Sequence, residues 1–283
     1  MIIVKQASTL ARYIEKEKKE GKIVGFVPTL GALHQGHMTL IGQCRQSSDF
    51  TVVSIFVNPT QFNNISDYRK YPHVIEKDIA LLATAGVDML FLPPLEEIYP
   101  NGTEGLETYD LGYLETVLEG KYRPGHFQGV CQVMQRLLNM VTPHKLFMGL
   151  KDYQQCMVVR RLLHIMESDI AFIGCDTVRE PDGLAMSSRN LRLSETERKK
   201  AATIYETLQM VNNELEPGDL RALKQKAVSK LEQAGFKVDY VEIADANSLE
   251  IVDSWDGKEP LVALAAAFIG EVRLIDNIVL KLL

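Results

Sequence analysis

Apolar and polar positions along the first 176 residues predict strands and helices in alternation. Short apolar runs rich in β-branched residues are typical of buried strands, and apolar residues three or four positions apart are typical of amphipathic helices. The expected strands lie at 23–27, 50–57, 87–92, 145–148 and 170–175, and the expected helices at 7–20, 38–47, 73–85, 125–141 and 152–167. This alternation predicts a parallel sheet covered by helices on both faces.

The pattern changes after residue 176, where the expected helices come first and the strands follow one another. The expected elements are a helix of about twenty residues opening at the capping box Ser194–Glu197, a second helix at 219–234, a strand at 238–243, and strands within 261–281 that turn at Gly270–Glu271. We therefore expect an α/β protein with a parallel-sheet domain at 1–176 and a smaller α+β domain at 177–283.

The segment Pro28–His37 reads Pro-Thr-Leu-Gly-Ala-Leu-His-Gln-Gly-His and directly follows the first of these expected strands. Ligands of open α/β sheets bind at the carboxyl ends of strands, and a helix N-terminus attracts phosphate. Gly31 and Gly36 would let a phosphate approach the backbone, and His34 and His37 would donate hydrogen bonds to it. The histidines could instead bind a metal or lie in a surface turn, but their place after a buried strand favours a nucleotide site.

Four more polar segments stand where strands are expected to end or helices to begin. They are Asn58–Phe62, Tyr122–Phe127, Gly149–Gln155 and Thr177–Asn190, and Asn58, Arg123 and His126 within them are possible anion contacts. Lys151 opposes the helix dipole at a helix start, so a bound phosphate explains it better than helix stability does. Each segment also has a reading without a ligand. In chain order, these readings are a turn capped by Asn58, ordinary residues at a helix start, an exposed polar helix face, and a solvated loop between the domains.

Composition narrows the possible partners. The 283 residues carry a formal net charge of −6 with both signs dispersed, which argues against nucleic acid or a membrane surface as the main partner. Four widely spaced cysteines indicate buried thiols rather than a zinc site or a disulfide framework: Cys44, Cys131, Cys156 and Cys175. With no transmembrane-length apolar run and no signal-peptide core, we expect a cytoplasmic protein.

The polar segments together closely resemble the pantothenate synthetases, or pantoate–β-alanine ligases. The matching stretches are Pro28–His37, Ile55–Phe62, Asp67–Pro72, Arg123–Val130, Gly149–Gln155, Thr177–Asn190 and Arg273–Asn277, which span nearly the whole chain in the family's order. The run Val178–Asn190 is the most specific. The His-x-Gly-His element alone is shared with the wider nucleotidylyltransferase superfamily and with class I aminoacyl-tRNA synthetases.

The resemblance implies a fold, a reaction and partners. The fold is a Rossmann-like ATP- and pantoate-binding domain with a small C-terminal lid domain, usually in a homodimer. The family uses ATP and Mg²⁺ to join pantoate to β-alanine through a pantoyl adenylate, releasing AMP and pyrophosphate on the route to vitamin B5 and coenzyme A.

The resemblance also implies roles for individual residues. His37, His34 and Lys151 are the expected catalytic residues, with His37 in the family's proton-donor position. The expected ATP contacts are Leu30, Gly31, Ala32, Leu33, His34, Gln35, Gly36, His37, Gly149, Leu150, Lys151, Asp152, Val178, Met186, Ser187, Ser188 and Arg189. Gln61 and Gln155 would hold pantoate, and Gln61 would also border β-alanine.

Three positions depart from the family pattern, and two other functions compete with the ligase. Leu30 replaces a methionine with little change in volume, and Leu150 replaces a common polar residue. The acidic segment near the metal reads Glu76-Lys77-Asp78, which leaves Asp78 as the metal candidate. The competing functions are an adenylyltransferase that keeps its adenylylated product and a non-catalytic nucleotide sensor.

Overall fold

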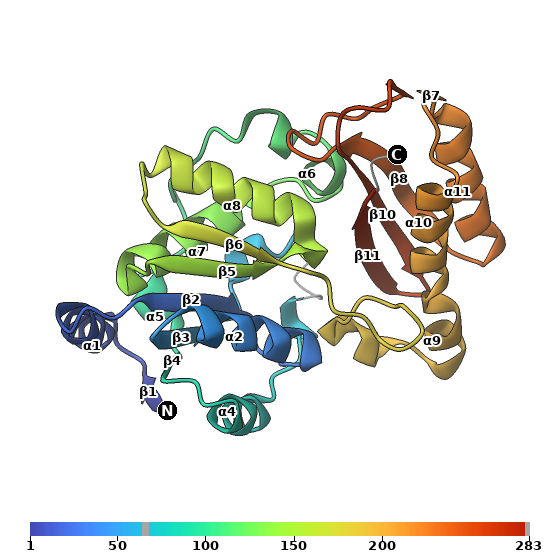
Figure 1. The fold of residues 1–283 in the computed structure, drawn as a ribbon. Helices are drawn as coiled ribbons and strands as arrows, with labels where there is room; N and C mark the ends of the chain where they lie inside the picture. Colours follow the sequence, from blue (N-terminus) through green and yellow to red (C-terminus); the bar gives the residue numbers. More distant parts are fainter. Residues whose placement is uncertain (64–67, 281–283) are drawn as a thin grey trace. The chain divides into compact units, whose positions relative to one another are not determined.

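The computed structural model describes residues 1–63 and 68–280, so Asp67 of the resembling segments and residue 281 of the last expected strand lie outside it (Figure 1). The chain divides into two compact units. Unit 1 is Met1–Leu150 with Gln154–Asp176, and unit 2 is Lys151–Tyr153 with Thr177–Leu283. Unit 2 therefore consists of a short segment at 151–153 and a long segment that starts at residue 177.

Unit 1 is built on a parallel sheet whose strand order, within the described ranges, is β1-β4-β3-β2-β5-β6. The strands are β1 (Ile2–Val4), β2 (Val24–Thr29), β3 (Phe50–Ile55), β4 (Met89–Phe91), β5 (Lys145–Gly149) and β6 (Ala171–Cys175). The helices are α1 (Ala7–Lys19), α2 (Gln35–Ser47), α4 (Ile75–Thr84), α5 (Leu95–Ile98), α6 (Leu118–Tyr122), α7 (His126–Val141) and α8 (Tyr153–Ile165), with 3₁₀ turns η1 (Pro59–Gln61), η2 (Gly112–Glu115) and η3 (Leu150–Asp152).

The central strands β2 and β3 of unit 1 are buried on both faces, with successive side chains pointing to opposite sides of the sheet. On β3, Val52 belongs to the cluster that includes residues of α1, α7 and α8, whereas Val53 belongs to the cluster with α2 and α4. Phe26 and Val27 of β2 divide in the same way. Figure 1 shows α7 and α8 on one side of this sheet and α2 and α4 on the other, so the expected parallel sheet with two covered faces is confirmed.

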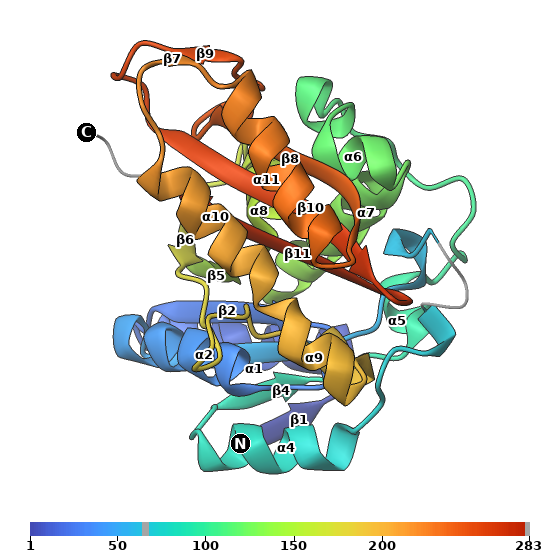
Figure 2. The same cartoon turned by 90° about the vertical axis from the view of Figure 1, so that its right-hand side faces the viewer.

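Unit 2 is an α+β structure around an antiparallel sheet of strand order β11-β10-β8. Its elements are η4 (Ser188–Arg192), α9 (Glu195–Ala201), α10 (Thr203–Asn213), β7 (Gly218–Asp219), α11 (Arg221–Gln233), β8 (Lys237–Asp245), β9 (Ser254–Trp255), β10 (Leu261–Ile269) and β11 (Val272–Val279). Figure 2 shows α10 and α11 covering one face of the sheet. Gly270 has φ of +55° in the turn from β10 to β11, which glycine accommodates readily.

Three expectations about elements need correction. The expected helix of about twenty residues is two helices that meet at Ala202, whose ψ of −20° tightens the backbone toward a 3₁₀ turn. Helix α2 begins at Gln35 rather than near residue 38, because the His34 side chain caps it. Strand β1 was not expected, and it pairs in parallel with β4. Within residues 1–63 and 68–280, we find no helix with the length and apolar character needed to cross a bilayer.

Candidate active site

The turn between β2 and α2 is held in an unusual backbone conformation by a buried acid. Gly31 has φ of +81° and Ala32 has φ of +50°, so two consecutive residues lie in the left-handed region. Asp78, which is 1% exposed, accepts hydrogen bonds from the N–H groups of Ala32 and Leu33, both at 2.8 Å. The backbone therefore enters α2 along a path that local preference alone would not favour.

The two histidines of this turn are oriented by backbone N–H groups. The Gly36 N–H donates to His34 Nδ1 at 3.2 Å, and the His34 N–H donates to His37 Nδ1 at 3.3 Å. A ring nitrogen that accepts a hydrogen bond carries no proton, so each neutral imidazole carries its proton on Nε2. The rings lie with centroids 4.1 Å apart. The N-terminus of α2 thus has two imidazole Nε2–H donors beside its own N–H groups.

Gln61 lies in η1, which follows β3 and packs directly on α7. A Cβ on Gly129 of α7 would lie 2.3 Å from the Thr60 carbonyl oxygen, so only glycine allows this approach. Asn58 is 0% exposed, and its Nδ2 donates to the Gly129 carbonyl at 3.0 Å and to Gln61 Oε1 at 3.2 Å. Its Oδ1 accepts from the Tyr99 hydroxyl at 2.8 Å. Asn58 is therefore a buried support of η1, which corrects its assignment as an anion contact.

Arg123 and His126 surround the same turn. His126 Nδ1 lies 2.7 Å from the Gln61 carbonyl oxygen, so this nitrogen is the donor, and His126 Nε2 lies 3.1 Å from Arg123 Nη1. Arg123 also pairs with Glu119 at 3.6 Å. The structure brings Asn58, Gln61, Arg123 and His126 together, with the last two bonded to protein groups around Gln61.

The adjacent residues Gln154 and Gln155 at the start of α8 have different surroundings. Gln154 is 3% exposed; its Oε1 accepts from the Glu119 N–H at 2.9 Å, and its Nε2 donates to the carbonyls of Leu114 and Val117 at 2.8 and 2.9 Å. Gln154 therefore fixes the chain before α6. Gln155 is half-buried, and the substrate role expected for it stays a prediction.

Lys151 is held by unit 2 although it lies between elements of unit 1 in the sequence. Its side chain is 18% exposed, with Nζ 3.7 Å from an Asp152 carboxylate oxygen. The Asn277 side chain, which comes from β11, donates to the Lys151 carbonyl at 2.8 Å. Tyr153 is anchored similarly, because its hydroxyl donates to the Ala246 carbonyl at 2.7 Å. Gly149 and Leu150 are also expected ATP contacts. Gly149 is the last residue of β5, and Leu150 is the first residue of η3, directly before Lys151.

The segment 177–190 folds back on itself in unit 2. The Met186 N–H donates to the Val178 carbonyl at 3.0 Å, so two expected ATP contacts are brought together. Ser187 caps η4 by accepting from the Arg189 N–H at 3.3 Å, and Ser188 is buried. The expected contacts at 186–189 therefore follow one another through a capped turn.

Several residues that organise these segments were missed in the sequence. Gly129 had a signal, because glycine inside a helical pattern costs about 1 kcal/mol and often marks a close approach. Asp276 and Asn277 lie within a stretch that matched the family, but no pattern pointed to the residues they bind. Tyr99 had no signal, because its partner Asn58 is 41 residues away in the sequence.

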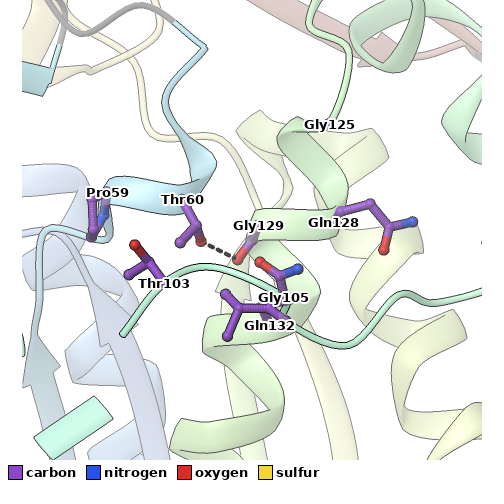
Figure 3. Close-up of a pocket in the computed structure, with 9 residues that line it drawn as sticks. Pro59, Thr60, Thr103, Gly105, Gly125, Gln128, Gly129 and Gln132 are labelled. Atoms are coloured by element: carbon purple, nitrogen blue, oxygen red, sulfur yellow. Dashed lines mark hydrogen bonds between the residues drawn. The ribbon is translucent and has the colours of Figure 1, made fainter. Parts of the chain in front are cut away.

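A pocket of about 450 Å³ lies beside η1 and α7 (Figure 3). It is lined by Pro59, Thr60, Thr103, Gly105, Leu106, Gly125, Gln128, Gly129 and Gln132. The amides of Gln128 and Gln132 donate to the backbone carbonyls of Tyr109 and Glu107, at 2.9 and 3.0 Å. None of the expected substrate contacts lines this pocket.

The metal candidate does not fit a metal site. Both carboxylate oxygens of Asp78 accept backbone N–H groups. Among the residues that the structure describes, no group of three or more His, Cys, Asp or Glu side chains could hold a metal ion.

Comparison with known proteins decides the family. Residues 2–279 match the family model described as pantoate-beta-alanine ligase. The chain belongs to this family. The pantothenate synthetase of Thermotoga petrophila is 42% identical over 284 residues, which cover 99% of this chain and 100% of that protein. The pantothenate synthetase of Azobacteroides pseudotrichonymphae is 41% identical over 280 residues, which cover 98% of this chain and 99% of that one.

Solved structures of ligases agree with the fold. The pantothenate synthetase of Thermus thermophilus matches with a TM-score of 0.89 and 39% identity, covering 98% of this chain and 99% of that one. The pantoate-beta-alanine ligase of Francisella tularensis, complexed with beta-gamma ATP and beta-alanine, matches with a TM-score of 0.82 and 37% identity, covering 99% and 97%. The expected α/β fold class and the expected enzyme, an ATP-dependent pantoate–β-alanine ligase, are confirmed.

Proposed function

We propose that this ligase works in two steps through pantoyl adenylate. In the first step, a carboxylate oxygen of pantoate bonds to the α-phosphorus of ATP as the bond to the bridging oxygen of pyrophosphate breaks. In the second, the neutral amine of β-alanine bonds to the acyl carbon, the bond from that carbon to the AMP oxygen breaks, and the amine gives up a proton. The products are pantothenate, AMP and pyrophosphate.

The observation that carries this proposal is the hydrogen bonding of the His34 and His37 Nδ1 atoms. Both rings use Nδ1 to accept backbone N–H groups, so both have Nε2–H donors at a helix N-terminus. The carboxylate of pantoate is already ionised near neutral pH, so the first step requires stabilisation of phosphate charge rather than a strong base. Preorganised hydrogen-bond donors supply that stabilisation because they do not need to reorient during the reaction.

Lys151 and the segment 186–189 are proposed as further contacts of ATP. Lys151 would neutralise charge on the phosphates, and Ser187, Ser188 and Arg189 would contact the triphosphate. Arginine suits this role because its planar guanidinium can bind phosphate through two parallel hydrogen bonds.

Gln61 and Gln155 are proposed to bind pantoate, with Gln61 also bordering β-alanine. An amide has both donors and an acceptor, which suits a substrate with hydroxyl and carboxylate groups. The bonds around the Gln61 carbonyl from His126 and Arg123 support its role, because they fix the backbone that carries the amide. Replacing Gln155 with alanine should weaken pantoate binding and leave ATP binding unchanged in calorimetry.

Mg²⁺ is proposed to arrive with ATP rather than in a site built by the protein. Mg²⁺ often binds through substrate phosphates and keeps several of its waters, which agrees with the described residues' lack of a metal cluster. The homodimer and the cytoplasmic location are further proposals that rest on the family resemblance alone. Light scattering, which gives the mass of the particle in solution, would test the homodimer.

Product analysis tests the proposed function. The protein is incubated with ATP, pantoate and β-alanine, and each substrate is omitted in turn. We expect AMP and pyrophosphate in equal amounts with pantothenate, and without β-alanine about one pyrophosphate per active site. ADP and phosphate as products would exclude the mechanism. ATP binding without turnover would favour the sensor, and release of an adenylylated product would favour an adenylyltransferase.

A further inference from the structure

Asp78 binds the turn before the two histidines from a distant part of the chain. It lies in the first turn of α4, 46 residues after Ala32, and its side chain is 1% exposed. One carboxylate oxygen accepts the Ala32 N–H and the other accepts the Leu33 N–H, both at 2.8 Å. Hydrogen bonds to an ionised acceptor are about twice as strong as neutral ones, so this side chain has a strong hold on two consecutive peptide units.

The turn needs such a hold, because its conformation is costly. Ala32 is an L-residue with φ of +50°, a region that costs about 1–2 kcal/mol. The space is also tight: a Cβ on Gly31 would lie 3.0 Å from Ile55 Cγ2 and 3.1 Å from Asp78 Oδ2. A strained backbone persists only where its surroundings over-determine it, and the Asp78 carboxylate supplies two of the bonds that do so.

The position of the turn decides the position of both imidazoles. The residue after Leu33 is His34, whose N–H donates to His37 Nδ1 at 3.3 Å and whose own Nδ1 accepts from Gly36. A change in the peptide planes at Ala32 and Leu33 would redirect the His34 N–H. Asp78 can therefore set the direction of the histidine Nε2–H groups without contacting a ligand itself.

The same geometry does not suit a metal ion on Asp78. Both oxygens face N–H groups, whose hydrogens carry partial positive charge. Mg²⁺ requires near-octahedral coordination at about 2.0–2.1 Å and usually keeps several waters, and a side chain that is 1% exposed leaves little room for them.

We propose that Asp78 is a positioning residue of the nucleotide site, which acts through the backbone of Ala32 and Leu33 and is not a ligand of Mg²⁺. The proposal rests on the proposed function, because it gives Asp78 a part in the use of ATP.

The test is Asp78→Asn, which keeps the shape of the side chain but places an amide NH₂ against a backbone N–H. We expect kcat/KM for ATP to fall about 10- to 100-fold, the scale of a lost charged hydrogen bond. The Mg²⁺ concentration that gives half-maximal velocity should stay within about twofold of the wild-type value, because a residue that does not bind Mg²⁺ should leave this requirement nearly unchanged. Glu76→Gln is the matched control, because Glu76 is an exposed acid in the same turn of α4; it should behave as the wild type.

A second kinetic measurement separates positioning from a general loss of structure. If Asp78 acts through the histidines, Asp78→Asn should add little to the loss in a variant in which His34 and His37 are both replaced by alanine. Additive effects would overturn the proposal. So would a tenfold rise in the Mg²⁺ requirement with full recovery of rate at high Mg²⁺, or wild-type activity in Asp78→Asn.

Amide NMR of the wild-type protein tests the proposal without measuring activity and without requiring that the variant folds. In the wild-type protein without ATP, added Mn²⁺ should leave the Ala32 and Leu33 amide signals sharp, and selective broadening of these signals would overturn the proposal. In a folded Asp78→Asn variant, the same two signals should shift upfield. Failure of the wild type to form pantothenate would instead refute the proposed function and leave these NMR outcomes intact.

Discussion

Two turns of this chain are each anchored by a buried carboxylate, and the two anchors work differently. In unit 1, Asp78 holds Ala32 and Leu33 through uncharged backbone N–H groups. In unit 2, Asp276 holds Arg179 through two bonds of 2.6 and 3.0 Å between side chains, across 97 residues of sequence. The first anchor fixes peptide planes directly, whereas the second fixes a side chain around which the loop is built.

The Arg179 side chain is the centre of the loop at 177–190. Its Nη1 donates to the Gly183 carbonyl at 3.0 Å, and its guanidinium carbon lies 3.9 Å from the centroid of the Tyr205 ring. A Cβ on Gly183 would lie 2.2 Å from Tyr205 Cδ1, so glycine is required there. Burial raises the pKa of Asp276, and the hydrogen bonds from Arg179 offset part of that rise. The loop therefore depends on a charge pair that is expensive to break.

The largest expected effect is the loss of this pair in unit 2. Arg179→Met leaves the Asp276 carboxylate, which is 0% exposed, without its partner. Removing one member of a buried pair costs about 3–5 kcal/mol of unfolding free energy. Since the Arg179 side chain is still 18% exposed, we expect a loss at the lower end, about 3 kcal/mol. Urea unfolding followed by fluorescence of Trp255, the single tryptophan and a buried residue of unit 2, measures it.

The control for this prediction is Arg221→Met. Arg221 pairs with Asp219 at 2.6 Å, but both side chains are well exposed, at 72% and 54%. An exposed pair is screened by solvent and contributes little to stability, so this variant should unfold close to the wild type. If Arg179→Met lost no more stability than Arg221→Met, the buried pair of Arg179 and Asp276 would not anchor the loop more strongly than an exposed pair does.

The next effect concerns one proposed catalytic residue from each unit. His37→Ala and Lys151→Ala should each lower kcat by about 100-fold or more, the scale for removing a group that stabilises transition-state charge. Thermal unfolding should change little, because neither side chain belongs to a core cluster. Steady-state kinetics with the melting temperature measures both. Near-wild-type kcat in either variant would show that its residue has no part in stabilising that charge.

A smaller effect tests whether β11 acts through Lys151. Asn277→Ala removes the 2.8 Å bond to the Lys151 carbonyl, and we expect kcat/KM for ATP to fall about tenfold, the scale of one hydrogen bond of about 1.4 kcal/mol. In the Lys151→Ala background the same change should have almost no effect, because interacting residues are not additive. Asn213→Ala, at an exposed asparagine, is the control. Equal losses in both backgrounds would mean that Asn277 supports the fold and not Lys151.

The difference between local patterns and contacts between distant residues explains what the sequence could predict. The strand and helix pattern of unit 1 was readable because the pattern is local: Val52 and Val53 are both apolar, as strands buried on both faces require. The His34 and His37 element was readable because glycine spacing and its place after a strand are local too. The residues that hold the turns, Asp78 and Asp276, are distant in sequence from what they bind, so no local pattern identifies their partners.

Burial decided the other differences between expectation and structure. Asn58 and Gln155 were chosen for their amides, but only packing shows that Asn58 is enclosed by Tyr99 and Gly129. Gln154 and Gln155 are identical in type and adjacent, and the contacts to Leu114 and Val117 that distinguish them come from a segment about 40 residues away. Residue type predicts which chemistry is available, and three-dimensional packing decides which side chain is left to perform it.

The smallest expected effect lies at the edge of the unit 2 loop, where a third acid is paired but exposed. Asp182 bonds to Arg198 of α9, and this hydrogen bond lowers the pKa of Asp182. The side chains are 41% and 34% exposed, so solvent screens the pair and Asp182→Asn should cost at most about 1 kcal/mol. The loss should shrink further in 1 M salt, where the Debye length is about 3 Å.

The pH dependence of that small effect has a definite sign. A carboxyl whose pKa is lower in the folded than in the unfolded protein adds stability above its unfolded value of about 3.9, and this contribution is lost as pH falls through the folded value. Asp182→Asn should therefore differ from the wild type at pH 6. The difference should begin to shrink as pH falls below about 3.9 and should vanish only below the lowered folded pKa of Asp182. Urea unfolding at pH 6 and through the range below about pH 4 measures the difference, and carboxyl-carbon NMR titration of Asp182 gives the folded pKa directly. A titration midpoint at or above the ordinary value would show that the pair with Arg198 adds no stability. Asp182 would then have no anchoring role, unlike the buried Asp276.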